Sequence, residues 1–169
     1  MAAIAEMVEI GCRIRREQCT LVSLLREAVT TERGLDVVTN FDNVKSAVSS
    51  LKGAGIIVSL FVDPNERQIR ASKETGADAI EIHTGRYAEA EDERTRSEEL
   101  ESIRAAVQLG NSMGFTVHAG HGLNYVNIFP VLSIPGIEEF NIGHSIISRA
   151  VFTGLDRAVR EMVELIRGT

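Results

Sequence analysis

Two polar side chains interrupt an otherwise apolar stretch of this chain. In residues 79–85 (AIEIHTG), Glu81 and His83 alternate with Ile80 and Ile82. If the stretch is a β-strand, both polar groups lie on one face and both isoleucines on the other. Removing a carboxylate and an imidazole from water is costly unless these groups are paired or used. The stretch therefore predicts either a structural Glu–His pair or a site that transfers protons and stabilises a charged intermediate.

A second candidate is a histidine that lies between two glycines in residues 117–123 (VHAGHGL). Gly120 and Gly122 permit positive φ and a close approach of the backbone to a ligand. His121 is expected to project from a loop at the carboxyl end of a strand, where ligands bind in α/β folds. The alternative is a tight turn in which the imidazole is incidental. His118 lies inside the strand and is expected to be a structural histidine with satisfied hydrogen bonds.

The Gly–His pattern recurs in residues 141–147 (NIGHSII). Gly143 is expected to begin a short helix, whose first backbone amides attract anions. Two Gly–His turns after the last two strands match the phosphate site of many (β/α)8 barrels. The sequence therefore predicts a phosphorylated small molecule as the ligand. The upstream loop of residues 29–36 (VTTERGLD) offers hydroxyls and a carboxylate for phosphate or hydroxyl recognition.

These residues lie on short apolar runs that alternate with segments of helical periodicity. The runs are rich in β-branched residues and predict parallel strands that are covered on both faces. They span residues 18–23, 55–62, 79–84, 115–119 and 139–146. Between them, the apolar residues at positions 44, 47, 48 and 51 follow the spacing of an amphipathic helix. Asp63-Pro64 is typical of a helix N-cap followed by proline. The alternation predicts an α/β protein built from crossover units.

The composition is that of an ordinary globular protein. Of the 169 residues, 44% are hydrophobic and 25% are charged, and the formal net charge is -6. This length predicts a single domain, and the negative charge disfavours a broad nucleic-acid-binding surface. No apolar run reaches the roughly 18 residues that a membrane span needs, and Cys12 and Cys19 are expected to be reduced thiols. We therefore expect a cytoplasmic protein with neither nucleic acid nor membrane as a partner.

The segments that carry these residues resemble one family, the pyridoxine 5'-phosphate synthases of vitamin B6 biosynthesis. The resemblance rests on VTTERGLDV, AGIIVSLFVDPNERQI, GADAIEIHTGRYA, VHAGHGLNYVN and EFNIGHSIISRAVFTGL, and it extends over residues 1–169. The combination of HTG, AGHGL and NIGH in this order is specific to that family. The resemblance implies an α/β fold of the TIM (β/α)8 type, of which this chain carries about five parallel strands with their helices.

The resemblance also implies a reaction and roles for particular residues. The family condenses 1-deoxy-D-xylulose 5-phosphate with 3-amino-2-oxopropyl phosphate to pyridoxine 5'-phosphate, phosphate and water, without a metal or organic cofactor. His121 would be the catalytic proton donor, and Glu81 the catalytic carboxylate that stabilises the transition state. The complete enzyme would be a homo-oligomer, an octamer. The positions that would bind the phosphorylated substrates are Thr30, Gly122, Gly143 and His144.

The chain departs from the family pattern in three places. Ser23-Leu24 stands where the family usually has Pro-Glu, and Arg33 replaces a usual glycine near the substrate rim. The family's first three strands carry an Asn-x-Asp-His motif, a His-Leu-Arg motif and a catalytic glutamate, and they have no counterpart here. We therefore expect a single domain over residues 1–169 that lacks the amino-terminal third of a barrel. The isolated chain is predicted to be poorly active or inactive, and its open sheet edges predict association.

Two other interpretations fit the same residues. One is a noncatalytic phosphate-binding or assembly module that needs a separate chain to supply the missing strands. It would bind a sugar phosphate without performing chemistry. The other is a complete five-stranded doubly wound domain, which would be a compact monomer that unfolds cooperatively.

Overall fold

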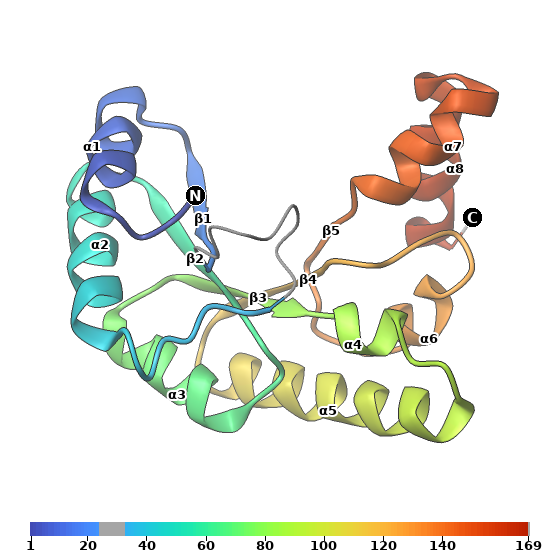
Figure 1. Cartoon of the computed structure of the whole chain (residues 1–169), viewed down its shortest axis with the longest axis horizontal. Coiled ribbons are helices and arrows are strands. Elements are labelled where there is room, and N and C mark those ends of the chain that lie inside the picture. The colour runs from blue at the N-terminus through green and yellow to red at the C-terminus, as the bar shows by residue number, and fades with distance from the viewer. Residues whose placement is uncertain (24–32, 169) are drawn as a thin grey trace.

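The computed structural model describes residues 1–23 and 33–168 (Figure 1). Thr30, one of the predicted substrate-binding residues, lies outside the described residues, as does Leu24. No helix within the described ranges is both long enough and apolar enough to cross a membrane. The elements are, in chain order, α1 (Ala5–Ile14), β1 (Gln18–Leu21), α2 (Phe41–Gly53), β2 (Ile57–Val62), α3 (Glu66–Thr75), β3 (Ala79–His83), α4 (Gly85–Ala88), α5 (Glu93–Ser112), β4 (Thr116–Gly120), α6 (Ile128–Leu132), β5 (Glu139–Asn141), α7 (His144–Thr153) and α8 (Leu155–Arg167).

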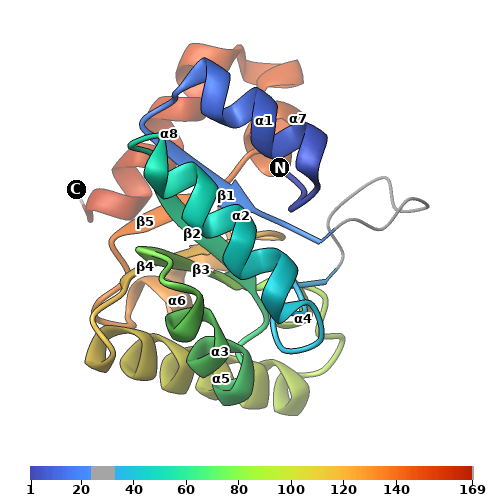
Figure 2. The same cartoon turned by 90° about the vertical axis from the view of Figure 1, so that its left-hand side faces the viewer.

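The five strands form one parallel sheet in the order β1-β2-β3-β4-β5. Each strand pairs with the next one in the sequence, which is the connectivity of a TIM-type barrel. The sheet curls into a half-barrel. Figures 1 and 2 show α1, α2, α3 and α5 around its outer side, and the α7–α8 hairpin beyond β5. A doubly wound sheet reverses its strand order at a switch point. The strand order here never reverses, so the doubly wound interpretation is wrong.

The outer face of the sheet is apolar and packs against the helices. α5 approaches the sheet closely at Gly110, where an added Cβ would lie 2.9 Å from both Ile80 and Val117. The predicted apolar face of α2 is confirmed, since all four of its apolar positions are buried. Each fully buried aliphatic side chain contributes about 1.5–3 kcal/mol. The buried cluster of sheet and helix residues includes Val44, Val48, Leu51, Val58, Leu60, Ile69, Ile80, Ile82, Ile103, Val107 and Val117.

The inner face of the same sheet carries a row of aromatic and titratable residues. The strand register pairs Phe61 with Glu81, Glu81 with His118, and His118 with Glu139. Paired residues of a parallel sheet point to the same side, and successive residues alternate. Glu81 and His83 therefore share the inner face, as the alternation in the sequence predicted. The half-barrel thus has an apolar outer layer, packed against the helices, and a polar inner surface.

Two element boundaries differ from those expected from the sequence. α3 is capped by Asn65, whose side chain accepts a hydrogen bond from Arg67 N at 3.0 Å. Asp63 was predicted to be this cap, and that prediction is wrong. β5 ends at Asn141 rather than continuing through residue 146, because His144 already begins α7. The apolar residues after His144 therefore belong to a helix.

Candidate active site

A pocket of about 760 Å³ opens at the carboxyl ends of the strands. In TIM barrels this edge of the sheet holds the active site. The pocket is lined by the ends of β1, β2 and β3 and by the turns after β4 and β5. Its lining contains every predicted site residue that the structure describes, namely Glu81, His121, Gly122, Gly143 and His144.

Glu81 is the buried carboxyl group of this pocket and is 8% exposed. Burial raises the pKa of this carboxyl from 4.5 to about 7, and repulsion from Glu139 on β5 acts in the same direction. Gly120 on β4 provides the space for it, because a Cβ at that position would collide with Oε1 of Glu81. A group whose pKa is near neutral is suited to both giving and taking a proton.

The turn after β4 holds His121 in an unusual backbone conformation. The φ angle of His121 is 80°, in the left-handed region that costs a non-glycine residue about 1–2 kcal/mol. The Thr84 hydroxyl lies 2.8 Å from the carbonyl oxygen of Gly120 and 2.6 Å from that of His121. Gly122 follows with φ 76°, and a Cβ there would lie 2.6 Å from that of Ala88. The neighbouring segments thus enforce this turn, and such enforced strain clusters at functional sites.

The second Gly–His turn leads into α7. Its N-cap is Gly143, which has no side chain to satisfy the first backbone N–H groups of the helix. Helix N-termini of this kind attract anions. The prediction that a helix begins here is confirmed, since α7 starts at His144. The Ser145 hydroxyl donates a hydrogen bond to the Leu123 carbonyl oxygen at 2.8 Å, which ties this turn to the one after β4.

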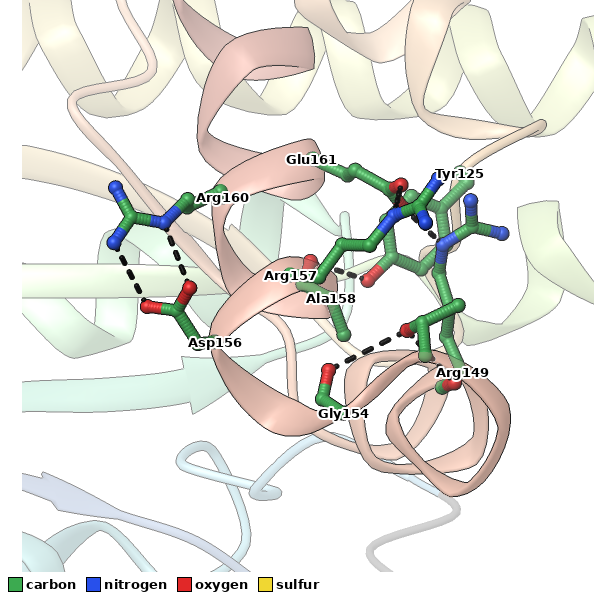
Figure 3. A network of polar contacts seen from close by, with 9 residues as sticks. Tyr125, Arg149, Gly154, Asp156, Arg157, Ala158, Arg160 and Glu161 are labelled. Atoms are coloured by element: carbon green, nitrogen blue, oxygen red, sulfur yellow. Dashed lines mark hydrogen bonds and ion pairs between the residues drawn. The ribbon is translucent and has the colours of Figure 1, made fainter.

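A polar network holds α7 and α8 against the segment that follows β4 (Figure 3). The Tyr125 hydroxyl donates to the carbonyl oxygen of Ala158 on α8 at 2.7 Å. The Arg149 guanidinium of α7 lies over the Tyr125 ring, 4.7 Å from its centroid. Glu161 on α8 forms ion pairs with both Arg149 and Arg157. These contacts join both carboxyl-terminal helices to one rim of the pocket.

His83 lies on β3 two residues after Glu81, and it has a partner that the sequence did not predict. Its Nδ1 lies 2.9 Å from Oδ1 of Asp63, the residue directly after β2. The same oxygen accepts a hydrogen bond from the Gly34 backbone N–H at 3.0 Å. The hydrogen bond with His83 is the main cause that lowers the pKa of Asp63, whereas burial opposes it. The predicted Glu81–His83 pair is therefore replaced by an Asp63–His83 pair.

His118 also differs from the expectation. It is buried beside Glu81, but within the described residues its Nδ1 has no hydrogen-bond partner, and Oε1 of Glu139 lies 4.0 Å away. The prediction that its hydrogen bonds are satisfied is wrong for this atom. Sequence reasoning also missed Asp63 and Thr84. The available signal was their position at the carboxyl ends of strands, where ligand sites form in α/β proteins.

The half-barrel, with its pocket at the carboxyl ends of parallel strands, places the chain in the class of TIM-type α/β proteins. A solved structure supports this class. The chain is similar to the crystal structure of the Amycolatopsis orientalis BexX/CysO complex, with a TM-score of 0.56 and 12% sequence identity over 98% of this chain and 62% of that chain. At this identity, the similarity concerns the fold alone.

The family follows from the sequence comparisons. The family model described as "Pyridoxal phosphate biosynthesis protein PdxJ" matches residues 1–168. Relatives named pyridoxine 5'-phosphate synthase are 69% identical in Trichlorobacter lovleyi, 54% in Pelobacter propionicus and 53% in Geobacter sulfurreducens. Each alignment spans 167 residues, 99% of this chain and 70% of the relative. The chain therefore belongs to the PdxJ family of vitamin B6 biosynthetic enzymes, and the resemblance inferred from its motifs is confirmed.

Proposed function

We propose that this pocket condenses 1-deoxy-D-xylulose 5-phosphate with 3-amino-2-oxopropyl phosphate to give pyridoxine 5'-phosphate, phosphate and water. The observation that carries the proposal is the shared pocket of Glu81 and His121, one a carboxyl with a pKa of about 7 and the other held on an enforced turn. The names of the relatives, pyridoxine 5'-phosphate synthase, support the product. The substrates and products balance without an oxidant or reductant, so the reaction requires no redox cofactor.

The residues of the pocket are assigned to separate tasks in this proposal. His121 donates a proton to departing oxygen groups, and Glu81 stabilises the positive charge that develops as the amine condenses with a carbonyl. A carboxyl of pKa about 7 carries out this task in its ionised form, which is substantially populated at neutral pH. The substrate phosphates bind at Thr30 and at the backbone amides of the two glycine-containing turns, at Gly122, Gly143 and His144.

We further propose that the isolated chain turns over slowly. The sheet of the described residues has five strands, and only a single parallel bridge, between Ala2 and Val22, extends it beyond β1. Among the described residues, no further strand closes the space on the inner side of this sheet. Catalysis of this type depends on excluding water from the reacting groups, so an open half-barrel is a poorer environment than a closed one.

The test is to incubate the purified chain with both substrates and to quantify pyridoxine 5'-phosphate by mass spectrometry. The Trichlorobacter lovleyi relative, assayed in parallel, is the reference. We expect product from this chain at a lower rate than from the relative. A chain that forms no product above background contradicts the synthase proposal, and equal rates contradict the proposed impairment.

The open sheet also favours a second candidate, a noncatalytic module that binds a phosphorylated ligand or assembles with a separate chain. Calorimetric titration with 1-deoxy-D-xylulose 5-phosphate separates the two functions. Binding without product formation supports the module. Product formation excludes it, and the absence of binding in the millimolar range contradicts both candidates.

A further inference from the structure

We propose that Asp63 and His83 form a positioning dyad that holds the ring of His121 toward the reacting groups. The proposal deepens the function given above and rests on it, because it defines the dyad by its action on the proton donor. Asp63 and His83 are positioning residues in this scheme, and His121 remains the residue that touches the substrate.

The first observation is the fixed geometry of the pair. His83 is 4% exposed, and its Nδ1 lies 2.9 Å from Asp63 Oδ1. The Gly34 N–H donates to that same oxygen, so the carboxylate is anchored on two sides. A carboxylate accepts hydrogen bonds only. Asp63 therefore requires a proton on Nδ1 of His83, which fixes both the orientation of the ring and its tautomer.

The second observation is the contact between the two imidazoles. The ring centroids of His83 and His121 lie 5.0 Å apart with an interplanar angle of 60°. Phe61 packs edge-on against His83 at 5.0 Å and lies 6.4 Å from His121. Edge-to-face packing of this kind is directional and favours particular orientations of the two rings. The fixed ring of His83 therefore limits the orientations that are open to His121.

The third observation is a glycine at the place where the two rings meet. A Cβ on Gly85 would lie 2.5 Å from Nε2 of His83 and 3.0 Å from Cδ2 of His121. Gly85 is the first residue of α4. A helical position accepts alanine, so the backbone conformation does not require glycine here. A side chain is excluded here because of the space that both rings need, so Gly85 makes their contact possible.

The dyad is tested with Asp63→Ala, which removes the acceptor, and with Asp63→Asn, which keeps an acceptor oxygen. Asp78→Ala is the matched control. Asp78 precedes β3 at the other end of the sheet, and it also accepts from a backbone N–H, that of Val58 at 3.0 Å, and from a cation, Lys52 at 2.6 Å. We expect Asp63→Ala to lower kcat about 10- to 100-fold with little change in KM. Asp63→Asn should recover most of this loss, and Asp78→Ala should retain the wild-type kcat.

Gly85→Ala tests the ring contact and leaves the carboxylate in place. It should lower kcat to a similar extent, since it separates the rings. An unchanged kcat in Asp63→Ala, or an equal loss in Asp78→Ala, overturns the dyad and leaves the proposed function standing. Absence of product from the wild-type chain contradicts the proposed function instead.

A spectroscopic measurement tests the dyad without any need for turnover. The chain has four histidines, so the long-range ¹H–¹⁵N correlations of its imidazoles can be assigned. We expect His83 to carry its proton on Nδ1 in the wild-type chain. In Asp63→Ala this preference should be lost and the signals of His121 should shift, whereas Asp78→Ala should leave both unchanged. His121 signals that are identical in wild type and Asp63→Ala overturn the proposal.

Discussion

At the scale of single residues, Glu81 occupies a position where its charge opposes folding. Its pKa is raised in the folded chain from 4.5 to about 7, chiefly by burial. Unfolding allows the carboxyl to ionise at a lower pH than in the folded chain. The contribution of Glu81 to the free energy of unfolding is therefore greatest below pH 4.5 and is lost as the pH rises through about 7. Glu81→Gln removes the penalty. We expect the variant to be about 3 kcal/mol more stable than wild type at about pH 8 and nearly equal to it at about pH 4.

Urea unfolding at the two pH values measures this difference. Glu74→Gln is the matched control, because Glu74 lies on the exposed side of α3. At about pH 8 we expect Glu74→Gln to change the free energy of unfolding by much less than Glu81→Gln does. A Glu81→Gln variant whose stability difference is the same at both pH values would show that burial does not set the pKa of Glu81.

The space above Gly120 gives a second prediction at this scale. In Gly120→Ala the new Cβ would collide with the Glu81 carboxylate and lie 3.0 Å from Asn141. We expect the carboxylate to be displaced and product formation to fall about 10- to 100-fold. Gly53→Ala is the control, since no atom lies within 4 Å of its added Cβ at the end of α2. That variant should keep its activity. Equal activities in the two variants would contradict the role of Gly120.

The sequence could predict which face these residues share but not which partners they have. Alternation along residues 79–85 places Glu81 and His83 on one side of a strand, whatever the rest of the fold. The partner of His83 depends on the register between β2 and β3, which brings Asp63 to its side. The raised pKa of Glu81 comes chiefly from its burial under the folded sheet and further from repulsion by Glu139, which lies two strands away. Both facts are tertiary, so no local pattern contains them.

At the scale of elements, each of the five predicted apolar runs overlaps an observed strand. The apolar residues of α2 recur at helical spacing, and its packing confirms the predicted face. The start of α3 was misplaced because Asp63 and Asn65 are both good capping residues. The Asp63 carboxylate is hydrogen-bonded to His83 and Gly34, and Asn65 caps the helix instead. The predicted strand over residues 139–146 was longer than β5 because the apolar pattern continues into α7 without a break.

The contact between Tyr125 and α8 leads to a prediction about how the rim is held. Tyr125→Phe keeps the ring under Arg149 but removes the hydrogen bond to Ala158. We expect a loss of about 1 kcal/mol in the free energy of unfolding and weaker binding of 1-deoxy-D-xylulose 5-phosphate. Thermal unfolding and calorimetry measure the two effects.

Ser133→Ala is the control for this prediction. The Ser133 hydroxyl is also bonded to a backbone carbonyl, that of Pro130 at 2.6 Å, but this contact is local and exposed. Its removal should leave ligand binding unchanged. If Tyr125→Phe binds the ligand as tightly as wild type, then the network in Figure 3 stabilises the helices without positioning the pocket.

At the scale of the whole molecule, the half-barrel exposes surfaces that a closed barrel would cover. Within the part of the chain that the structure describes, the sheet has open edges, and the α7–α8 hairpin carries exposed apolar side chains. Val151 is 78% exposed and Phe152 is 90% exposed. Exposed apolar clusters favour association. Composition alone could not show this, because 44% hydrophobic residues is ordinary for a globular chain and says nothing about where those residues lie.

We therefore predict that the chain self-associates. Sedimentation velocity should give a mass above the 18.5 kDa of one chain, and Phe152→Lys should shift the population toward smaller species. Lys45→Ala, in α2 on the side of the molecule opposite α7 and α8 (Figure 1), should leave the distribution unchanged. A wild-type chain that sediments as a monomer at every concentration would contradict the prediction.

The most direct test of the proposed active site is the rate of pyridoxine 5'-phosphate formation by His121→Asn relative to wild type. Asparagine tolerates the left-handed backbone that residue 121 adopts, so this variant removes the imidazole and preserves the turn. We expect measurable product from the wild-type chain and a rate of product formation at least about 100-fold lower from the variant. Equal rates from the two chains would show that His121 is not the proton donor of this pocket.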